Sequence, residues 1–390
     1  MISVDQALER IFNLLSVLPT ETVALADAAG RVLAEPATAG RDQPPFAASA
    51  MDGYAVRAED AQPGGSLTVI GESAAGHGFS GTVRNGQAVR IFTGAPVPEG
   101  ATRVIIQEDV TREFDSITLH DKLDSASNIR RAGADFAKGA KLSAPRRLSP
   151  SDLALLASMN LATLPVARRP VVALIATGDE LVMPGEEPGP DQIIASNTFG
   201  LKALVEAEGA VARLLPIARD TAASLRTAFE LATGADLIVT IGGASVGDHD
   251  IVGDVAAELG MEQVFYKVAM RPGKPLMAGR MGDAALIGLP GNPVSAMVCG
   301  HVFLLPAIRA LLGLARAPTP RQHATLGCAI AANGPREHYM RARVEDGRIT
   351  PHERQDSSLL TVLAEANALL VRPVNDPERP AGMAVAYIPL

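Results

Sequence analysis

Short apolar runs and helical segments alternate along the chain from Pro170 to Leu312, and this alternation limits the possible folds more than any other feature. Strands are predicted at Val171–Ala176, Val211–Ile217, Leu237–Ile241, Val264–Val268 and Ala284–Ile287. Helices are predicted between and after them at Thr198–Glu208, Thr221–Leu231, Asp250–Leu259 and Pro293–Leu312. Such alternation predicts a parallel sheet with helices on both faces.

The remainder of the chain divides into segments of different texture. Ser3 and Gln6 resemble a capping box before an amphipathic helix, and a second helix is predicted at Leu25–Ala34. From Gln43 to about Arg131, short β-branched runs alternate with turn residues, and after Pro318 a similar pattern continues to the end. The expected domains are a discontinuous helical linker domain (1–42 with 139–168), a β-rich insert (43–138), an αβα domain (169–316) and a C-terminal β domain (317–390). The C-terminal domain is expected to be a small β-barrel or sandwich.

Charge and cysteine usage exclude several classes of protein. The 35 Lys and Arg residues against 43 Asp and Glu give a net charge of -8, which disfavours a nucleic-acid-binding protein. The two cysteines, Cys299 and Cys328, form no metal-binding or disulfide pattern. The first residues lack the basic region of a signal peptide, and the apolar run Ala296–Leu305 is too short to cross a bilayer. We therefore expect a cytoplasmic protein without a membrane partner.

Three loops rich in glycine and proline follow apolar runs within the αβα domain. They are 242–250 (GGASVGDHD), 271–275 (RPGKP) and 289–295 (LPGNPVS). Ligands of open α/β sheets bind at the carboxyl ends of the strands, and glycines let the backbone approach an anion closely. With the cations Arg271 and Lys274, these loops predict a site for a phosphate-bearing small molecule.

Each loop alone is also consistent with an ordinary turn. Asp248 and Asp250 would repel an anion unless a cation such as Mg²⁺ lay between them. In Thr177–Glu180 the two adjacent acids suit either metal or acid–base chemistry, or a helix-dipole cap. The segment Ser49–Ala55 is predicted to be a loop with a functional role, because it presents Met, Asp and Tyr beside a glycine.

Taken in order, these motifs resemble the molybdopterin molybdenumtransferases, the family that includes the E domain of gephyrin. The resemblance covers essentially the whole chain and rests on Ser49–Ala55, Ile91–Pro96, Asn128–Arg131, Thr177–Leu181, Gly242–Asp250, Pro272–Pro275 and Leu289–Ser295. It implies a multidomain α/β plus β fold, in which a three-layer αβα molybdopterin-binding domain stands beside the β-rich insert, the helical linker domain and the C-terminal barrel-like domain. The implied reaction converts adenylylated molybdopterin and molybdate into molybdenum cofactor and AMP, with Mg²⁺ assisting.

The resemblance also implies an assembly and a set of site residues. The family forms homodimers whose active site joins the αβα domain of one subunit to the β insert of the other. Molybdopterin adenylyltransferase and molybdoenzyme chaperones are further candidate partners. The implied catalytic residues are Asp52, Asp135, Glu180, Asp250 and Lys274, with Asp220 and Asp250 as metal ligands. The implied substrate-binding residues are Thr93, Arg130, Gly242, Gly243, Ser245, Arg271, Pro290, Asn292, Pro293, Ser295, Arg341 and Ser358.

Three positions depart from the family pattern. Arg271 stands where the family commonly has Lys, Ala134 stands where an acid usually precedes Asp135, and Asp356 replaces a common Gly. Two other activities remain open at this point. The αβα domain alone resembles the domain of molybdopterin adenylyltransferases, and a non-catalytic scaffold could keep the same fold.

Overall fold

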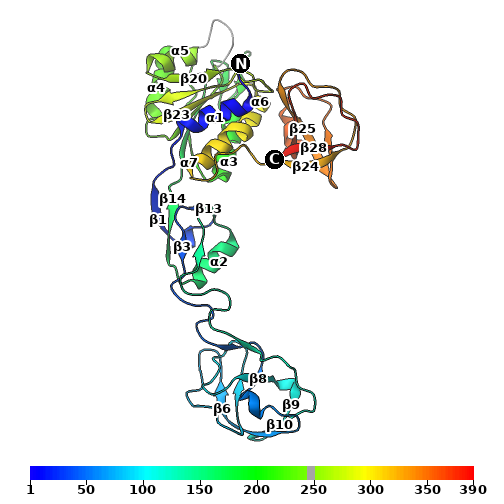
Figure 1. Ribbon diagram of the computed structural model, residues 1–390. Helices are drawn as coiled ribbons and strands as arrows, with labels where there is room; N and C mark the ends of the chain where they lie inside the picture. The colour runs from blue at the N-terminus through cyan, green and yellow to red at the C-terminus, as the bar shows by residue number, and fades with distance from the viewer. Residues whose placement is uncertain (244–250) are drawn as a thin grey trace. The chain divides into compact units, whose positions relative to one another are not determined.

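The computed structural model describes residues 1–243 and 251–390, and the labels used below are those of Figure 1. The chain forms two compact units. One comprises Met1–Glu21 with Ala167–Leu390, and the other comprises Thr22–Val166. The four domain ranges expected from the sequence divide the chain more finely and stay predictions.

The larger unit is built on a six-stranded sheet. Its strands are, in order, β18 (Val211–Leu214), β15 (Val171–Ala176), β19 (Leu237–Ile241), β23 (Ala284–Leu289), β22 (Met277–Met281) and β20 (Glu262–Tyr266). The first four strands are parallel, whereas β22 is antiparallel to both of its neighbours. The prediction of a purely parallel sheet is therefore wrong at this edge. The missed strand, β22, contains Met, Ala, Gly and Arg and no β-branched residue, so its sequence carries little strand signal.

Helices cover both faces of this sheet, as Figure 1 shows. On one face lie α4 (Ala222–Leu231) and α5 (Ile251–Glu258), and on the other α1 (Val4–Leu14), α3 (Asn197–Ala207), α6 (Pro293–Cys299) and α7 (Leu305–Leu311). The predicted three-layer αβα arrangement is confirmed. A π-helical turn, Gly300–Leu304, joins α6 to α7. This continuous helix, Pro293–Leu311, is long and apolar enough to cross a membrane, but 83% of its most apolar 18-residue stretch is buried, as in the core helix of a globular fold.

The C-terminal region of the same unit is a closed five-stranded barrel. Its strands are β24 (Gln322–Leu326), β25 (Glu337–Glu345), β26 (Arg348–Pro351), β27 (Ala368–Arg372) and β28 (Ala384–Pro389). Strand β27 pairs with both β28 and β25, which closes the barrel. A short strand of the αβα domain, β21 (Met270–Arg271), pairs in parallel with β25 and so ties the 271–275 loop to the barrel. The short helix α8 (Leu360–Glu365) also contacts β25.

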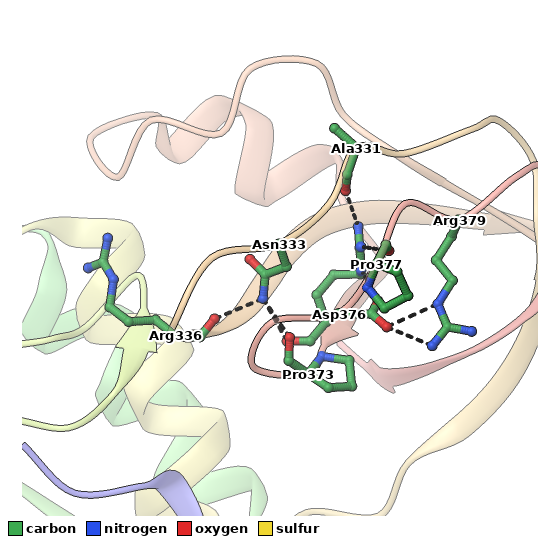
Figure 2. A network of polar contacts seen from close by, with 8 residues as sticks. Ala331, Asn333, Arg336, Pro373, Asp376, Pro377 and Arg379 are labelled. Carbon is green, nitrogen blue, oxygen red and sulfur yellow. Dashed lines mark hydrogen bonds and ion pairs between the residues drawn. The ribbon is translucent and has the colours of Figure 1, made fainter.

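A buried ion-pair network joins the loops at one end of the barrel (Figure 2). The Asp376 carboxylate accepts hydrogen bonds from Arg372 Nε at 2.5 Å and from Arg379 Nε and Nη2 at 3.0 and 2.6 Å. Arg372 also donates to two backbone carbonyls, and the Asn333 amide donates to three. Burial raises the pKa of Asp376, but the two guanidinium groups more than offset this and hold the pKa below its usual value.

The smaller unit is built mainly on a four-stranded sheet and a six-stranded sheet, each with a two-stranded pair beside it in the chain. Near its boundary, β1 (Thr20–Ala24), β14 (Thr163–Ala167), β2 (Val32–Leu33) and β13 (Arg146–Arg147) form a four-stranded sheet beside α2 (Pro150–Ser158), and β3 (Ala37–Thr38) pairs with β12 (Lys141–Leu142). The predicted helix at Leu25–Ala34 is wrong. Only Leu25–Asp27 forms a 3₁₀ turn, and β2 follows a turn at Gly30, whose φ is +69°.

The β insert contains the six-stranded sheet. Its order is β8 (Arg103–Ile106), β5 (Gly53–Val56), β7 (Gln87–Ile91), β6 (Ser66–Ser73), β10 (Ser116–Leu119) and β9 (Val110–Glu113), with 3₁₀ turns at Ala58–Asp60 and Gln107–Asp109. Beside it β4 (Ala48–Ser49) pairs with β11 (Ile129–Arg130). The prediction that Ser49–Ala55 is a loop is wrong, because β5 is an internal strand. Only Ala50–Asp52 connect β4 to β5.

Candidate functional site

A cavity of about 500 Å³ opens at the carboxyl ends of β15, β19 and β23. The loops that follow these three strands supply most of its walls, as expected for an open α/β sheet. A small ribbon of β16 (Leu181–Val182) and β17 (Ile193–Ile194) lines the remaining side. The sequence-predicted residues in its wall are Glu180, Asp220, Gly242, Gly243, Pro290, Asn292 and Pro293.

Glycines bring backbone close to backbone in the cavity wall. Gly242 has φ +98°, and a Cβ there would lie 2.7 Å from the Thr177 carbonyl oxygen. At Gly243, with φ +66°, a Cβ would lie 2.2 Å from Val252 Cγ2. The Gly242 N–H donates to the Leu289 carbonyl, so this group is not free to bind a phosphate as the sequence suggested. The glycines therefore act by removing side chains from the wall.

Two carboxylates from different loops, those of Glu180 and Asp220, line the cavity. The two loops are joined directly, because the Asp220 N–H donates to Asp179 Oδ1 at 3.1 Å and the Gly178 N–H donates to the Ala218 carbonyl at 3.1 Å. Among the described residues, no three His, Cys, Asp or Glu side chains converge into a preformed metal site. Two carboxylates beside a cavity do fit a hard cation such as Mg²⁺, which usually combines one or two carboxylates with phosphate oxygens of the substrate.

A cluster of cationic groups lies where β21 meets the barrel. Arg271 pairs in register with His338, and the buried Arg341 follows three residues later on β25. Burial lowers the pKa of the Arg341 guanidinium, and the charge of Arg271 lowers it further while Asp356 opposes the shift. Nε and Nη1 of Arg341 are buried and have no hydrogen-bond partner among the described residues. A guanidinium left in this state favours an anionic ligand.

The segment Arg354–Ser358 connects this cationic cluster to the cavity. Arg341 Nη2 donates to the carbonyl oxygens of Arg354 and Asp356 at 3.2 and 3.1 Å. Asn292, in the cavity wall, donates through Nδ2 to Ser357 Oγ at 3.1 Å. The Ser358 hydroxyl and N–H both donate to Asp356 Oδ1 and lower the pKa of that carboxyl.

A separate group of polar residues lies in the β insert. Asp52 Oδ1 accepts hydrogen bonds from the Thr93 N–H and hydroxyl, both at 2.7 Å, and these bonds lower the pKa of Asp52. Arg90 donates to the Gly53 carbonyl and lies over the rings of Tyr54 and Phe92, at 5.1 and 4.7 Å from their centroids. The Asp52 carboxylate is thus held in place by Thr93, and the Gly53 carbonyl beside it by Arg90.

Comparisons with known proteins match three successive regions of the chain. Family models described as the MoeA N-terminal region (domain I and II), a probable molybdopterin-binding domain and the MoeA C-terminal region (domain IV) match residues 2–160, 173–310 and 323–390. A molybdopterin molybdenumtransferase of Nostoc sp. is 36% identical over 100% of this chain and 94% of its own length. The chain belongs to the molybdopterin molybdenumtransferase family.

Other members of this family support the same assignment. A molybdopterin molybdenumtransferase of Haemophilus influenzae is 40% identical over 80% of this chain and 78% of its own length. A crystal structure of the molybdopterin biosynthesis MoeA protein of Pyrococcus horikoshii matches with a TM-score of 0.87 at 28% identity, covering 100% of both chains. The expected multidomain fold is therefore confirmed over its full length.

The remaining site residues expected from the family are each placed within their own unit. Lys274 is exposed and directly precedes Pro275, which lines the cavity, whereas Ser295 is buried in the first turn of α6. In the other unit, β11 places Arg130 beside Ala48, and the Asp135 N–H donates to the Gln43 carbonyl. Ser245 and Asp250 lie outside the described residues. The functional roles expected for all of these residues stay predictions.

Sequence reasoning missed three residues that organise these sites. Asn197 lines the cavity and donates through Nδ2 to the Gly291 carbonyl at 2.7 Å. Arg90 braces the Asp52 connection, and Arg219 contacts the Thr177–Leu181 loop. The Ser196-Asn197-Thr198 sequence at the start of α3 could have indicated Asn197, since such residues favour helix starts. Nothing in the local sequence distinguishes Arg90 or Arg219 from a surface arginine.

Proposed function

We propose that this protein inserts molybdenum from molybdate into adenylylated molybdopterin, with release of AMP, to give molybdenum cofactor. The observation that carries the proposal is the continuity of two different sites in one unit. A cavity with carboxylates and glycine backbone adjoins a cationic cluster through Asn292 and Ser357. The cavity suits an adenylylated pterin, and the cluster suits a tetrahedral oxyanion.

Different residues would bind the phosphates, the molybdate and the Mg²⁺. Gly242 and Gly243 leave room for the anhydride phosphates, and Asn292 and Pro293 close the wall beside them. Arg271, Lys274 and Arg341 supply positive charge for molybdate next to the substrate's own dithiolene sulfurs, so no cysteine ligand is required. Glu180 and Asp220 would hold Mg²⁺, which neutralises charge on the anhydride phosphates when it is bound.

An adenylyltransferase or a scaffold explains fewer of these features. An adenylyltransferase built from the αβα domain alone would need neither the barrel nor Arg341. A scaffold would have no need for the buried Arg341 guanidinium, two of whose nitrogens have no hydrogen-bond partner among the described residues. We therefore favour the insertase.

The direct test supplies purified protein with adenylylated molybdopterin, molybdate and Mg²⁺. AMP release is followed by chromatography, and cofactor is followed by reconstitution of an apo-molybdoenzyme. We expect AMP release that depends on molybdate. Release that is equally fast without molybdate, or no release at all from well-folded protein, would contradict the proposal.

We further propose a cytoplasmic homodimer in which Asp52 of one subunit completes the cavity of the other. Asp52→Asn and Lys274→Ala should each lower the rate without changing the fold. If sites are shared, mixing and re-equilibrating the two inactive variants should restore about a quarter of wild-type activity, because about half of the dimers are mixed and each mixed dimer has one intact site. A mixture as inactive as its components would contradict the shared site. Asp60→Asn serves as a control substitution in the same insert, because the Asp60 carboxylate accepts a hydrogen bond from the Gly86 N–H and not from Thr93.

A further inference from the structure

Arg219 holds the loop that follows β15. Its Nη1 donates to the carbonyl oxygens of Asp179 and Leu181 at 3.0 and 2.9 Å, and more weakly to that of Gly178 at 3.4 Å. Three carbonyls from one loop therefore converge on a single guanidinium nitrogen that comes from a segment about 40 residues further along the chain. Glu180 is the residue between the two carbonyls bound at shorter distance.

The same loop is fixed by its backbone conformation. Gly178 has φ +146°, a value that L side chains rarely adopt, and a Cβ there would lie 2.2 Å from Glu180 Oε2. The Glu180 carboxylate therefore folds back over the Gly178 backbone. Its position depends on the path of the chain through Gly178, Asp179 and Leu181, the residues whose carbonyls Arg219 binds.

Arg219 also lies beside the second carboxylate of the cavity. Asp220 is the next residue, and its N–H donates to Asp179 Oδ1. The Arg219 N–H donates to Ser224 Oγ at 2.9 Å, which ties the segment to the start of α4. The contacts of Arg219 and Asp220 thus join the loop that carries Asp179 and Glu180 to the segment that carries Asp220. Glu180 and Asp220 line the cavity, whereas Arg219 is not among the residues that line it.

We propose that Arg219 is a positioning residue that holds Glu180 and Asp220 at the separation needed to bind a divalent cation with substrate phosphate. Arg219 acts through these two carboxylates and does not touch the substrate. The inference rests on the function proposed above. Loss of a group that hydrogen-bonds a metal ligand directly typically costs about 10- to 100-fold in metal affinity, and because Arg219 acts through the loop backbone we expect the lower end of this range.

The chain offers a matched control for the guanidinium-to-carbonyl contact. Arg213, in the same domain, donates through Nη1 to the carbonyl oxygens of Leu231 and Thr233 at 3.1 and 3.0 Å, near the end of α4. Neither acceptor lines the cavity. Arg213→Gln therefore reports the general cost of losing such a contact, and Arg219→Gln reports the same cost plus any effect on the carboxylates.

The decisive measurement is Mn²⁺ binding in the presence of AMP, followed by the loss of the free-ion electron paramagnetic resonance signal. We expect Arg219→Gln to weaken Mn²⁺ binding about tenfold and Arg213→Gln to leave it unchanged. Arg219→Lys should stay within about threefold of wild type, because an ammonium group offers three donors to the three carbonyls. In turnover, Arg219→Gln should raise the Mg²⁺ concentration for half-maximal rate by a similar factor.

A second comparison separates positioning from general stability. If Arg219 acts through Glu180, adding Arg219→Gln to Glu180→Gln should weaken Mn²⁺ binding by less than about twofold more. Mn²⁺ binding by Arg219→Gln equal to that of Arg213→Gln, at comparable melting temperatures, would overturn the inference. Failure of wild-type protein to release AMP would instead contradict the proposed function, so the two failures are distinguishable.

Discussion

Two buried arginines on adjacent strands of the barrel, Arg372 on β27 and Arg341 on β25, have opposite surroundings. Arg372 forms an ion pair with Asp376, and each of its guanidinium nitrogens has a hydrogen-bond partner. Among the residues that the structure describes, the Arg341 guanidinium bonds only through Nη2, and only to backbone carbonyls. Both side chains are almost fully removed from solvent. The barrel can therefore supply hydrogen-bond partners for every nitrogen of a buried guanidinium, as it does at Arg372. Among the described residues it does not do so at Arg341.

This contrast indicates different roles for the two residues. A buried charge without a partner is costly, so a protein tolerates one where a ligand supplies the missing interactions. Arg341 lies beside Arg271 and the segment that connects to the cavity, which suits an anion site. Arg372 binds Asp376 and the carbonyls of Ala331 and Pro377, which are labelled in Figure 2, and these contacts suit a structural role. The same substitution at both positions tests this distinction.

The largest effect is expected for Arg372→Gln. This substitution removes one partner of a buried pair and leaves the carbonyls of Ala331 and Pro377 without their donor. Asp376 keeps Arg379, so we expect a loss of about 3 kcal/mol in the free energy of unfolding, at the low end for a broken buried pair. Urea denaturation followed by circular dichroism measures it. Activity per folded molecule should stay unchanged, and a stable but inactive variant would show that Arg372 belongs to the site.

Arg341→Gln should produce the reverse pattern. Because the Arg341 guanidinium has no carboxylate bonded to it, removing its charge should change the free energy of unfolding by less than about 1 kcal/mol. The rate of molybdate-dependent AMP release should fall about 10²-fold, comparable to loss of one strong oxyanion contact. Raising the molybdate concentration should recover part of the rate. A variant as unstable as Arg372→Gln with normal turnover would show that the two arginines do not differ in role.

Much of the αβα domain could be predicted from sequence because its signals are local. The strand Val171–Ala176 has the predicted bounds, and the loop after it lines the cavity as expected. Gly242, Asn292 and Pro293 were found through turn motifs that directly follow apolar runs. Here the position of a residue along the sequence and its position at the sheet edge are linked by the parallel topology.

Other features depend on contacts between distant segments and could not be predicted. Strand β22 was missed because Met277–Met281 has weak strand propensity and forms only against β23 and β20. The importance of Arg219 depends on carbonyls about 40 residues away. Arg341 was assigned from the resemblance alone, since its burial and missing partners follow from closure of the barrel. No local pattern reports any of these.

His338 offers a prediction with a smaller expected effect, because the charges of both Arg341 and Arg372 lower its pKa. Burial is the main cause that lowers its pKa to about 4, followed by the charges of Arg271, Arg341, Arg372 and Arg336. Between the ordinary pKa of 6.5 and this lowered value, the unfolded chain binds a proton that the folded protein does not. Stability is therefore lost as pH falls through this window, by about 1 kcal/mol for this group between pH 7 and 5.5. In His338→Gln that part of the slope should disappear, as urea denaturation at the two pH values would measure.

The same histidine can report which arginine receives the anion. An anion bound between Arg271 and Arg341 would offset two of the four charges that act on His338, so saturating molybdate should raise its pKa. Proton resonances of the His338 ring, titrated with and without molybdate, would show the shift directly. The shift should persist in Arg372→Gln and be lost or much reduced in Arg341→Gln. An equal response in both variants would mean that molybdate does not distinguish the two arginines, and the contrast between them would then concern stability alone.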